Sequence, residues 1–245
     1  MGTDLLQPLA RLARRHAWRA GLALSLTTLS ASAHAKTFMV IGDSLSQGLG
    51  AAMARCFVPD ADVQFIQKGK INTGLTRKQP LDWMVEAGQL AKTKPDAVIM
   101  QIGGNDINPL MVNGHLSAVG SDDWKAEYAR RVASIVQAFE DAGAKVFWVG
   151  LPFPERIDFQ DPYHTINGVI AQQVGTGPVK FYDIWDTFLV DGKYSSYGVD
   201  LKNNKVLIRA EDGVHFTAAG YTKEANLVVP DLATNFSITG ADCAH

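Results

Sequence analysis

The sequence of 245 residues contains no apolar run long enough to cross a bilayer and no cluster of histidines. The apolar run at 20–29 is far shorter than the roughly 20 residues that a membrane helix needs. Beyond residue 35 there are four histidines, His115, His164, His215 and His245, none of which belongs to an HxH or HExxH pattern. These absences argue against a membrane span in the mature chain and against metal-dependent catalysis. We therefore expect no metal and no organic cofactor.

The first 35 residues have the pattern of a bacterial export signal. Arginines at positions 11, 14, 15 and 19 precede the apolar run, and Ala33-His34-Ala35 matches an A-x-A cleavage site. We predict cleavage after Ala35 and a periplasmic or secreted protein. Without this segment, 19 Lys and Arg remain against 24 Asp and Glu, a formal charge of −5. No basic block is left, so a nucleic-acid partner has no electrostatic support.

The sequence has only two cysteines, Cys56 and Cys243, and both belong to the part predicted to be exported. In an oxidising compartment an even pair can form a disulfide, which here would tie the C-terminal segment to the first helix. The alternative is one buried thiol and one thiol in a frayed tail. Both interpretations stay open on the sequence alone.

Strand-like and helix-like stretches alternate from residue 36 onward, as the periodicity of their apolar residues indicates. We predict strands at 37–41, 62–67, 97–102, 145–151 and 179–184, and helices at 46–56, 81–92, 122–142, 166–174 and 218–232. This alternation favours a three-layer α/β/α sandwich with a central, mostly parallel five-stranded sheet. We expect residues 36–245 to form a single domain, in which the polar stretch 191–204 is a hairpin or an excursion.

Polar residues with catalytic potential follow the predicted strands. The first strand ends at Gly42-Asp43-Ser44, the second precedes the glycine-containing loop 69–77, the third ends at Gly103-Gly104-Asn105-Asp106, and Asp212-Gly213-Val214-His215 precedes the last helix. Because parallel strands present their carboxyl ends at one edge of a sheet, we expect these four loops to meet there. Each loop taken alone is also ordinary turn chemistry.

Together the four loops supply the parts of acyl transfer from an ester. Ser44 would attack the carbonyl, His215 would take and return the proton, and Asp212 would orient the imidazole. The N–H of Ser44, the N–H of Gly74 and the side-chain amide of Asn105 are candidate donors to the oxyanion.

These motifs resemble the four blocks of the SGNH (GDSL-type) hydrolases. The resemblance covers Gly42-Asp43-Ser44, Gly74, the block at 103–106 and Asp212-x-x-His215, in the family's order. More locally, the stretches 72–77, 148–152 and 207–209 look like a periplasmic bacterial subgroup. The resemblance implies a flavodoxin-like fold, a Ser44–His215–Asp212 triad and an oxyanion hole built from Ser44, Gly74 and Asn105. Gly69 competes with Gly74 for the glycine position.

The resemblance implies an exported serine esterase that removes O-acyl groups, O-acetyl in particular, from a carbohydrate or glycoconjugate. Two alternatives remain: an O-acyltransferase that works with envelope polysaccharide machinery, and a non-catalytic glycan-binding protein. We expect Asp43 to brace the nucleophile turn through backbone N–H groups. Arg209 would brace the histidine loop or bind an anion, and Trp83 would bind a sugar ring or brace the site. Apolar loops at 108–112 and 153–154 would line an acyl pocket.

Overall fold

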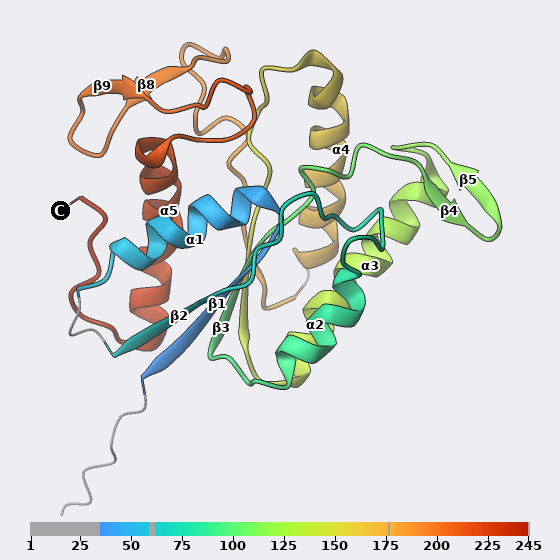
Figure 1. Cartoon of the computed structure of the whole chain (residues 1–245), viewed down its shortest axis with the longest axis horizontal. Helices are drawn as coiled ribbons and strands as arrows, with labels where there is room; N and C mark the ends of the chain where they lie inside the picture. Colours follow the sequence, from blue (N-terminus) through green and yellow to red (C-terminus); the bar gives the residue numbers. More distant parts are fainter. Residues whose placement is uncertain (1–34, 59–61, 176, 245) are drawn as a thin grey trace, which may run out of the picture. The chain divides into compact units, whose positions relative to one another are not determined.

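A parallel sheet of five strands is the framework of the described chain (Figure 1). Its strand order is β2-β1-β3-β6-β7, and every neighbouring pair runs parallel. The strands are β1 (Lys36–Gly42), β2 (Val63–Gln67), β3 (Ala97–Gln101), β6 (Lys145–Val149) and β7 (Lys180–Tyr182). The predicted five-stranded parallel sheet is confirmed.

The computed structural model describes residues 35–58, 62–175 and 177–244, and these belong to one compact unit. Residues 1–34 of the predicted export signal lie outside the described residues, so cleavage after Ala35 stays a prediction. Among the described residues, no helix is both long enough and apolar enough to cross a membrane.

Helices cover both faces of the sheet (Figure 1). On one face lie α1 (Ser44–Arg55) and α5 (Ala218–Phe236), and on the other lie α2 (Trp83–Ala91), α3 (Asp122–Asp141) and α4 (Ile157–Val174). Side chains of a strand alternate between its faces. In β1, Phe38 and Val40 therefore pack in the core beneath α1 and α5, whereas Met39 and Ile41 pack in the core on the opposite face. The three-layer α/β/α architecture is confirmed.

Two hairpins lie outside this sheet. The first joins β4 (Leu110–Val112) to β5 (His115–Ser117), and the second joins β8 (Tyr197–Val199) to β9 (Lys205–Leu207). The stretch 191–204, predicted to be a hairpin or an excursion, contains β8 and the turn of the second hairpin, whereas β9 lies just beyond it. The prediction of an acyl-pocket loop at 108–112 is wrong, because residues 110–112 form β4 with Leu110 buried in the core and Met111 exposed, and none of the stretch lines the cleft at Ser44.

Two helices are longer than predicted, and each contains a proline. The helix α4 begins at Ile157 rather than at residue 166 and contains Pro162, and α5 continues past Pro230 to Phe236. A proline inside a helix removes one backbone hydrogen bond and usually bends or ends it. Here Tyr163, immediately after Pro162, is fully buried in the core, and such packing stabilises a helix against its local preferences.

Cys56 and Cys243 form a disulfide between the end of α1 and the C-terminal segment. The contact is reinforced by backbone hydrogen bonds, since the N–H of Asp242 donates to the oxygen of Cys56 at 2.7 Å and that of Val58 donates to Gly240 at 3.2 Å. Of the two sequence interpretations, the structure shows the cross-link.

A buried polar contact joins α5 to the carboxyl end of the sheet. Glu224 on α5 has no exposed surface and accepts a hydrogen bond from Nε2 of Gln101, the last residue of β3, at 2.5 Å. The same nitrogen donates to the oxygen of Gly150 at 3.2 Å, just beyond β6. Burial raises the pKa of Glu224 to about 8, although the Gln101 hydrogen bond and the charge of Arg209 act in the opposite direction. In the folded protein, Glu224 is therefore protonated and uncharged below about pH 8.

This buried acid predicts a pH-dependent stability. The folded protein keeps the Glu224 proton up to about pH 8, whereas the unfolded chain releases it near its ordinary pKa of 4.5. The free energy of unfolding should therefore fall as the pH rises through this window, by a few kcal/mol in total. Glu224→Gln cannot ionise, so it should unfold at higher urea concentration than the wild type at about pH 9 and at a similar concentration at about pH 4. Parallel pH profiles for the two proteins would contradict this prediction.

Candidate active site

The turn that carries Ser44 is held tightly against the end of β3. Gly42 has a φ of +137°, and a Cβ atom at this position would lie 1.8 Å from the oxygen of Gln101. Only glycine fits such a close approach of two backbones. The N–H of Asp43 donates to the same Gln101 oxygen at 3.1 Å, and the N–H of Lys70 donates to the oxygen of Gly42 at 2.8 Å. Ser44 then opens α1, partly exposed at the carboxyl edge of the sheet.

Asp43 links this turn to the loop that follows β3. Its buried carboxylate caps α1 by accepting from the N–H of Leu45 at 3.0 Å. The other carboxylate oxygen accepts from the N–H groups of Gly103 at 3.0 Å and Gly104 at 2.8 Å. Burial raises the pKa of Asp43 to about 6, against the lowering effect of these hydrogen bonds. The structure thus places Asp43 behind the site, with its carboxylate on backbone N–H groups.

The structure brings Ser44, His215 and Asp212 into one hydrogen-bonded chain. The Oγ of Ser44 lies 2.7 Å from Nε2 of His215, and Nδ1 of His215 lies 2.6 Å from Oδ2 of Asp212. The other oxygen of Asp212 accepts from the N–H groups of Val214 and His215, each at 2.9 Å. Burial acts to raise the pKa of Asp212, but these hydrogen bonds outweigh it and hold the pKa below its usual value. Asp212 is therefore poised as a carboxylate beside the imidazole.

Arg209 fixes the loop that carries this histidine. Its side chain is almost fully buried, and its guanidinium donates to the oxygens of Gly213 at 3.1 Å and Val214 at 3.0 Å. A further hydrogen bond of 3.0 Å reaches the oxygen of Phe153. Burial lowers the pKa of Arg209. Of the two roles expected for Arg209, the contacts show bracing, and its burial keeps it away from an anion in solution.

Two of the predicted oxyanion donors come from loops that contact each other. The amide nitrogen of Asn105 donates to the oxygen of Thr73 at 2.9 Å, which places the Gly74 loop beside Asn105. Within the described residues, the N–H groups of Ser44 and Gly74 donate to no other group. Gly69, the competing glycine, packs instead against the side chains of Ser46 and Gln47 in the first turn of α1 and makes no contact with Asn105. The geometry therefore favours Gly74 over Gly69.

The carboxylate of Asp106 clamps the Gly74 loop, a contact that the sequence analysis missed. It accepts from the N–H of Leu75 and the N–H and hydroxyl of Thr76, each at 2.8 Å, and from the hydroxyl of Tyr128 at 2.9 Å. A Cβ atom on Gly74 would lie 2.1 Å from Oδ1 of Asp106, so glycine is required here. The available signal was a second acid directly after Asn105 and a tyrosine on the buried face of α3.

Trp83 lies beneath the same loop rather than in the cleft. It is 1% exposed, and its Nε1 donates to the hydroxyl of Thr73 at 2.9 Å. The interpretation that Trp83 binds a sugar ring is therefore wrong, because a buried indole cannot stack on a ligand. Its hydrogen bond to Thr73 instead helps to hold the Gly74 loop in place, which is the bracing role.

A polar cleft of about 200 Å³ opens above Ser44 and His215. Asn105 and Gly104 line one part of it, and Arg156 and Phe159 from the start of α4 line another. Neither Arg156 nor Phe159 was among the predicted site residues, because α4 was expected to begin only at residue 166. Phe153, expected to line an acyl pocket, packs instead against the ring of Trp185, with the centroids 5.1 Å apart.

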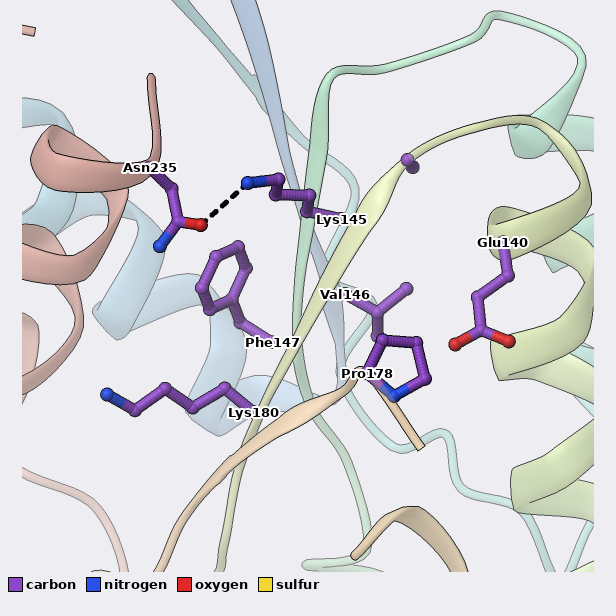
Figure 2. Close-up of a pocket in the computed structure, with 8 residues that line it drawn as sticks. Glu140, Lys145, Val146, Phe147, Pro178, Lys180 and Asn235 are labelled. Atoms are coloured by element: carbon purple, nitrogen blue, oxygen red, sulfur yellow. Dashed lines mark hydrogen bonds between the residues drawn. The ribbon is translucent and has the colours of Figure 1, made fainter. Parts of the chain in front are cut away.

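A separate cavity of about 410 Å³ lies at the opposite, amino edge of the sheet (Figure 2). Figure 2 shows Lys145 and Lys180, the first residues of β6 and β7, on either side of Phe147. Both amino groups are already paired, that of Lys145 with Asn235 at 2.7 Å and that of Lys180 with Asp231. None of the predicted catalytic residues lines this cavity. Across the described parts of the chain, no group of three or more His, Cys, Asp and Glu side chains could hold a metal ion.

The fold is shared with solved esterases. The lipase/acylhydrolase from Enterococcus faecalis superposes with a TM-score of 0.60 at 15% identity, covering 82% of this chain and 96% of that one. A catalytic mutant of Axe2, an acetylxylan esterase from Geobacillus stearothermophilus, gives 0.57 at 16% identity, covering 80% and 94%. The sheet order, the strand-end loops and the serine–histidine–aspartate arrangement define an SGNH (GDSL-type) hydrolase, a class of serine esterases and acyl hydrolases.

Within that class, the chain belongs to the family described as "Protein of unknown function (DUF459)", which matches residues 37–231. Sequence similarity also reaches the Esterase TesA of Pseudomonas aeruginosa. The two are 25% identical over 166 residues, which are 65% of this chain and 77% of the esterase. The resemblance to the SGNH hydrolases and the assignment as a serine esterase are thus confirmed.

The contact between Gly74 and Asp106 predicts that this glycine cannot be replaced. In Gly74→Ala the new methyl group must displace Asp106 or the loop, which moves the Gly74 N–H from the position that its predicted role as an oxyanion donor requires. Loss of one such donor should lower kcat for a small ester by roughly 10²–10³-fold.

Gly88→Ala is the matched control, because a Cβ atom at this helical glycine meets nothing within 4 Å. It should keep full activity and gain up to about 1 kcal/mol of stability. Equal activity of the Gly74 and Gly88 variants would show that the Gly74 N–H has no part in the reaction.

Proposed function

We propose that the protein is an exported serine esterase that removes O-acyl groups, O-acetyl in particular, from a carbohydrate or glycoconjugate. The main support for this proposal is the hydrogen-bonded chain of Ser44, His215 and Asp212. Its two hydrogen bonds are 2.7 Å long between Ser44 and His215 and 2.6 Å long between His215 and Asp212. It opens into a cleft that also holds Asn105.

In the proposed reaction, Ser44 Oγ attacks the ester carbonyl while Nε2 of His215 takes the serine proton. Asp212 holds the proton on Nδ1 and stabilises the imidazolium that forms. His215 then gives its proton to the departing alcohol, which leaves an acyl-serine. A water molecule, deprotonated by the same imidazole, attacks the acyl-serine. The bond to Ser44 Oγ then breaks, His215 returns the proton to this oxygen, and the acid is released.

The negative charge on the carbonyl oxygen would be met by donors that the fold has already positioned. The N–H groups of Ser44 and Gly74 are free to donate, and the second hydrogen of the Asn105 amide is available beyond its bond to Thr73. Donors fixed before the substrate arrives cost no reorganisation during the reaction. Asp43 and Asp106 fix them, because each carboxylate holds the backbone of a donor loop.

The substrate class is supported by the size and polarity of the cleft. A volume of about 200 Å³ suits a short acyl group and not a long chain. Similarity of fold to an acetylxylan esterase is consistent with an acetylated glycan.

Transfer of the acyl group to a sugar hydroxyl, as in an O-acyltransferase of envelope polysaccharide, would use the same residues. The histidine side chain is 32% exposed, which leaves the acyl-enzyme open to water and favours hydrolysis. The intact hydrogen-bonded chain argues against a purely glycan-binding protein.

Export is supported by two features. The pattern of residues 1–35 is that of a cleavable signal. The disulfide between Cys56 and Cys243 is of the kind that persists in oxidising compartments. A periplasmic or secreted location would also bring the enzyme to acylated polysaccharides.

Substitutions in the triad test this mechanism with p-nitrophenyl acetate. Ser44→Ala and His215→Ala should each lower kcat by at least about 10³-fold, because the nucleophile or its base is lost. Asp212→Asn should cost less than His215→Ala, since the imidazole remains in place. His164→Ala is the control: this exposed imidazole packs against Trp185, away from the cleft, so activity should be retained.

Thermal unfolding of each variant separates loss of activity from loss of fold. Near wild-type turnover by a folded Ser44→Ala protein would refute the mechanism. Mass spectrometry of an acetylated oligosaccharide, incubated with an unacetylated acceptor, separates the two reactions: free acetate indicates an esterase, and an acetylated acceptor indicates a transferase.

A further inference from the structure

The loop that carries Gly74 is basic, although the chain as a whole is acidic. From residue 63 to residue 81 there is no Asp or Glu, while the stretch contains Lys68, Lys70, Arg77 and Lys78. All four side chains are exposed. A one-signed cluster on a protein of opposite net charge raises the local concentration of counter-charged ligands.

Backbone contacts hold this basic loop directly beside the nucleophile turn. The N–H of Lys70 donates to the oxygen of Gly42, two residues before Ser44, at 2.8 Å. Farther along the loop, Nη2 of Arg77 approaches the backbone oxygen of Asn105 at 3.4 Å. The basic loop therefore runs beside both the nucleophile turn and the loop of Asn105.

These two cations are also available for a ligand. Lys78 lies 3.8 Å from Asp82, so its charge is partly met within the protein. No carboxylate of the described residues lies within 4 Å of the charged atoms of Lys70 or Arg77. Apart from the contact of Arg77 with the oxygen of Asn105, these two charged groups have no hydrogen-bond partner among the described residues.

The opposite wall of the cleft has no such excess of positive charge. Arg156 lies over the ring of Phe159 at 4.1 Å and pairs with Asp158 at 2.5 Å. Glu155, which precedes Arg156, is exposed, and its N–H donates to Gly213 in the histidine loop. Arg156, which lines the cleft, is thus paired with Asp158, whereas Lys70 and Arg77 of the neighbouring basic loop have no such carboxylate partner among the described residues.

We propose that the substrate of this site carries carboxylate groups close to its ester, as an O-acetylated polyuronate does, and that Arg77 and Lys70 bind them. This inference rests on the proposed esterase function. A planar guanidinium matches a carboxylate with two parallel hydrogen bonds, whereas a neutral glycan offers it only hydroxyls. Lys70 adds a second positive charge on the same side of Ser44, suited to a chain that repeats its negative charge.

Three probes test the proposal: acetylated polygalacturonate, acetylated xylan and p-nitrophenyl acetate. The wild type should show a higher kcat/KM for acetyl release from polygalacturonate than from xylan. Raising NaCl to about 0.3 M should lower the polygalacturonate value by roughly tenfold and change the other two by less than about twofold, since salt screens exposed charges.

Charge-removing variants locate the recognition. Arg77→Gln should lower the ratio of kcat/KM for polygalacturonate to that for p-nitrophenyl acetate about tenfold, mainly through KM. Lys70→Gln should lower the same ratio by a smaller factor. Lys92→Gln removes an equal charge from the exposed end of α2, and this control should leave the ratio unchanged.

The outcomes distinguish this inference from the proposed function. Hydrolysis of p-nitrophenyl acetate and xylan without preference for polygalacturonate, or equal effects of the Arg77 and Lys92 variants, would overturn the inference alone. Failure on all three probes would overturn the esterase function as well. Unacetylated polygalacturonate should inhibit competitively at concentrations where inorganic phosphate does not. Equal inhibition by phosphate would show a site for small anions and overturn the assignment to a carboxylated glycan.

Discussion

The buried carboxylate of Asp43 is the contact on which the site depends. It joins three N–H groups from two loops, so the turn of Ser44 and the loop of Asn105 cannot move independently. The cost is a negative charge without solvent, visible in its raised pKa. Asp106 acts in the same way on the Gly74 loop, where its carboxylate accepts hydrogen bonds from the backbone N–H groups of Leu75 and Thr76. The site is therefore built on two carboxylates that never meet the substrate.

Electrostatic organisation around the histidine follows a different principle. Arg209 supplies hydrogen-bond donors to the carbonyl groups of two loops, and its burial sets the position of Val214 and, with it, of His215. Acids thus fix the donor side of the cleft through N–H groups, while a cation fixes the base side through carbonyl groups. The polarity of the backbone explains this difference. Free N–H groups need an acceptor, which a carboxylate provides, and free carbonyl oxygens need a donor, which a guanidinium provides.

The main features of the site could be predicted because parallel topology gathers strand-end loops at one edge. Ser44, His215, Asp212 and Asn105 each follow or precede a regular element whose periodicity is visible in the sequence. Contacts between side chains leave no such periodic signal. The clamp at Asp106 needs the register of α3 against the Gly74 loop. Sugar binding and bracing both stayed open for Trp83 because the sequence around an aromatic residue does not reveal its burial. The early start of α4 was hidden by Pro162, whose local preference is overridden by packing.

The cross-link at the far end of α1 bears on the order in which the enzyme becomes complete during synthesis. Ser44 opens this helix, and the disulfide that fixes its other end needs Cys243, 187 residues after Cys56. His215 also lies far downstream of the nucleophile. A partly translated or truncated chain therefore carries its serine on a helix that is unanchored at one end and has no base. We therefore expect Ser44 to hydrolyse no esters until the downstream part of the chain has been made and folded.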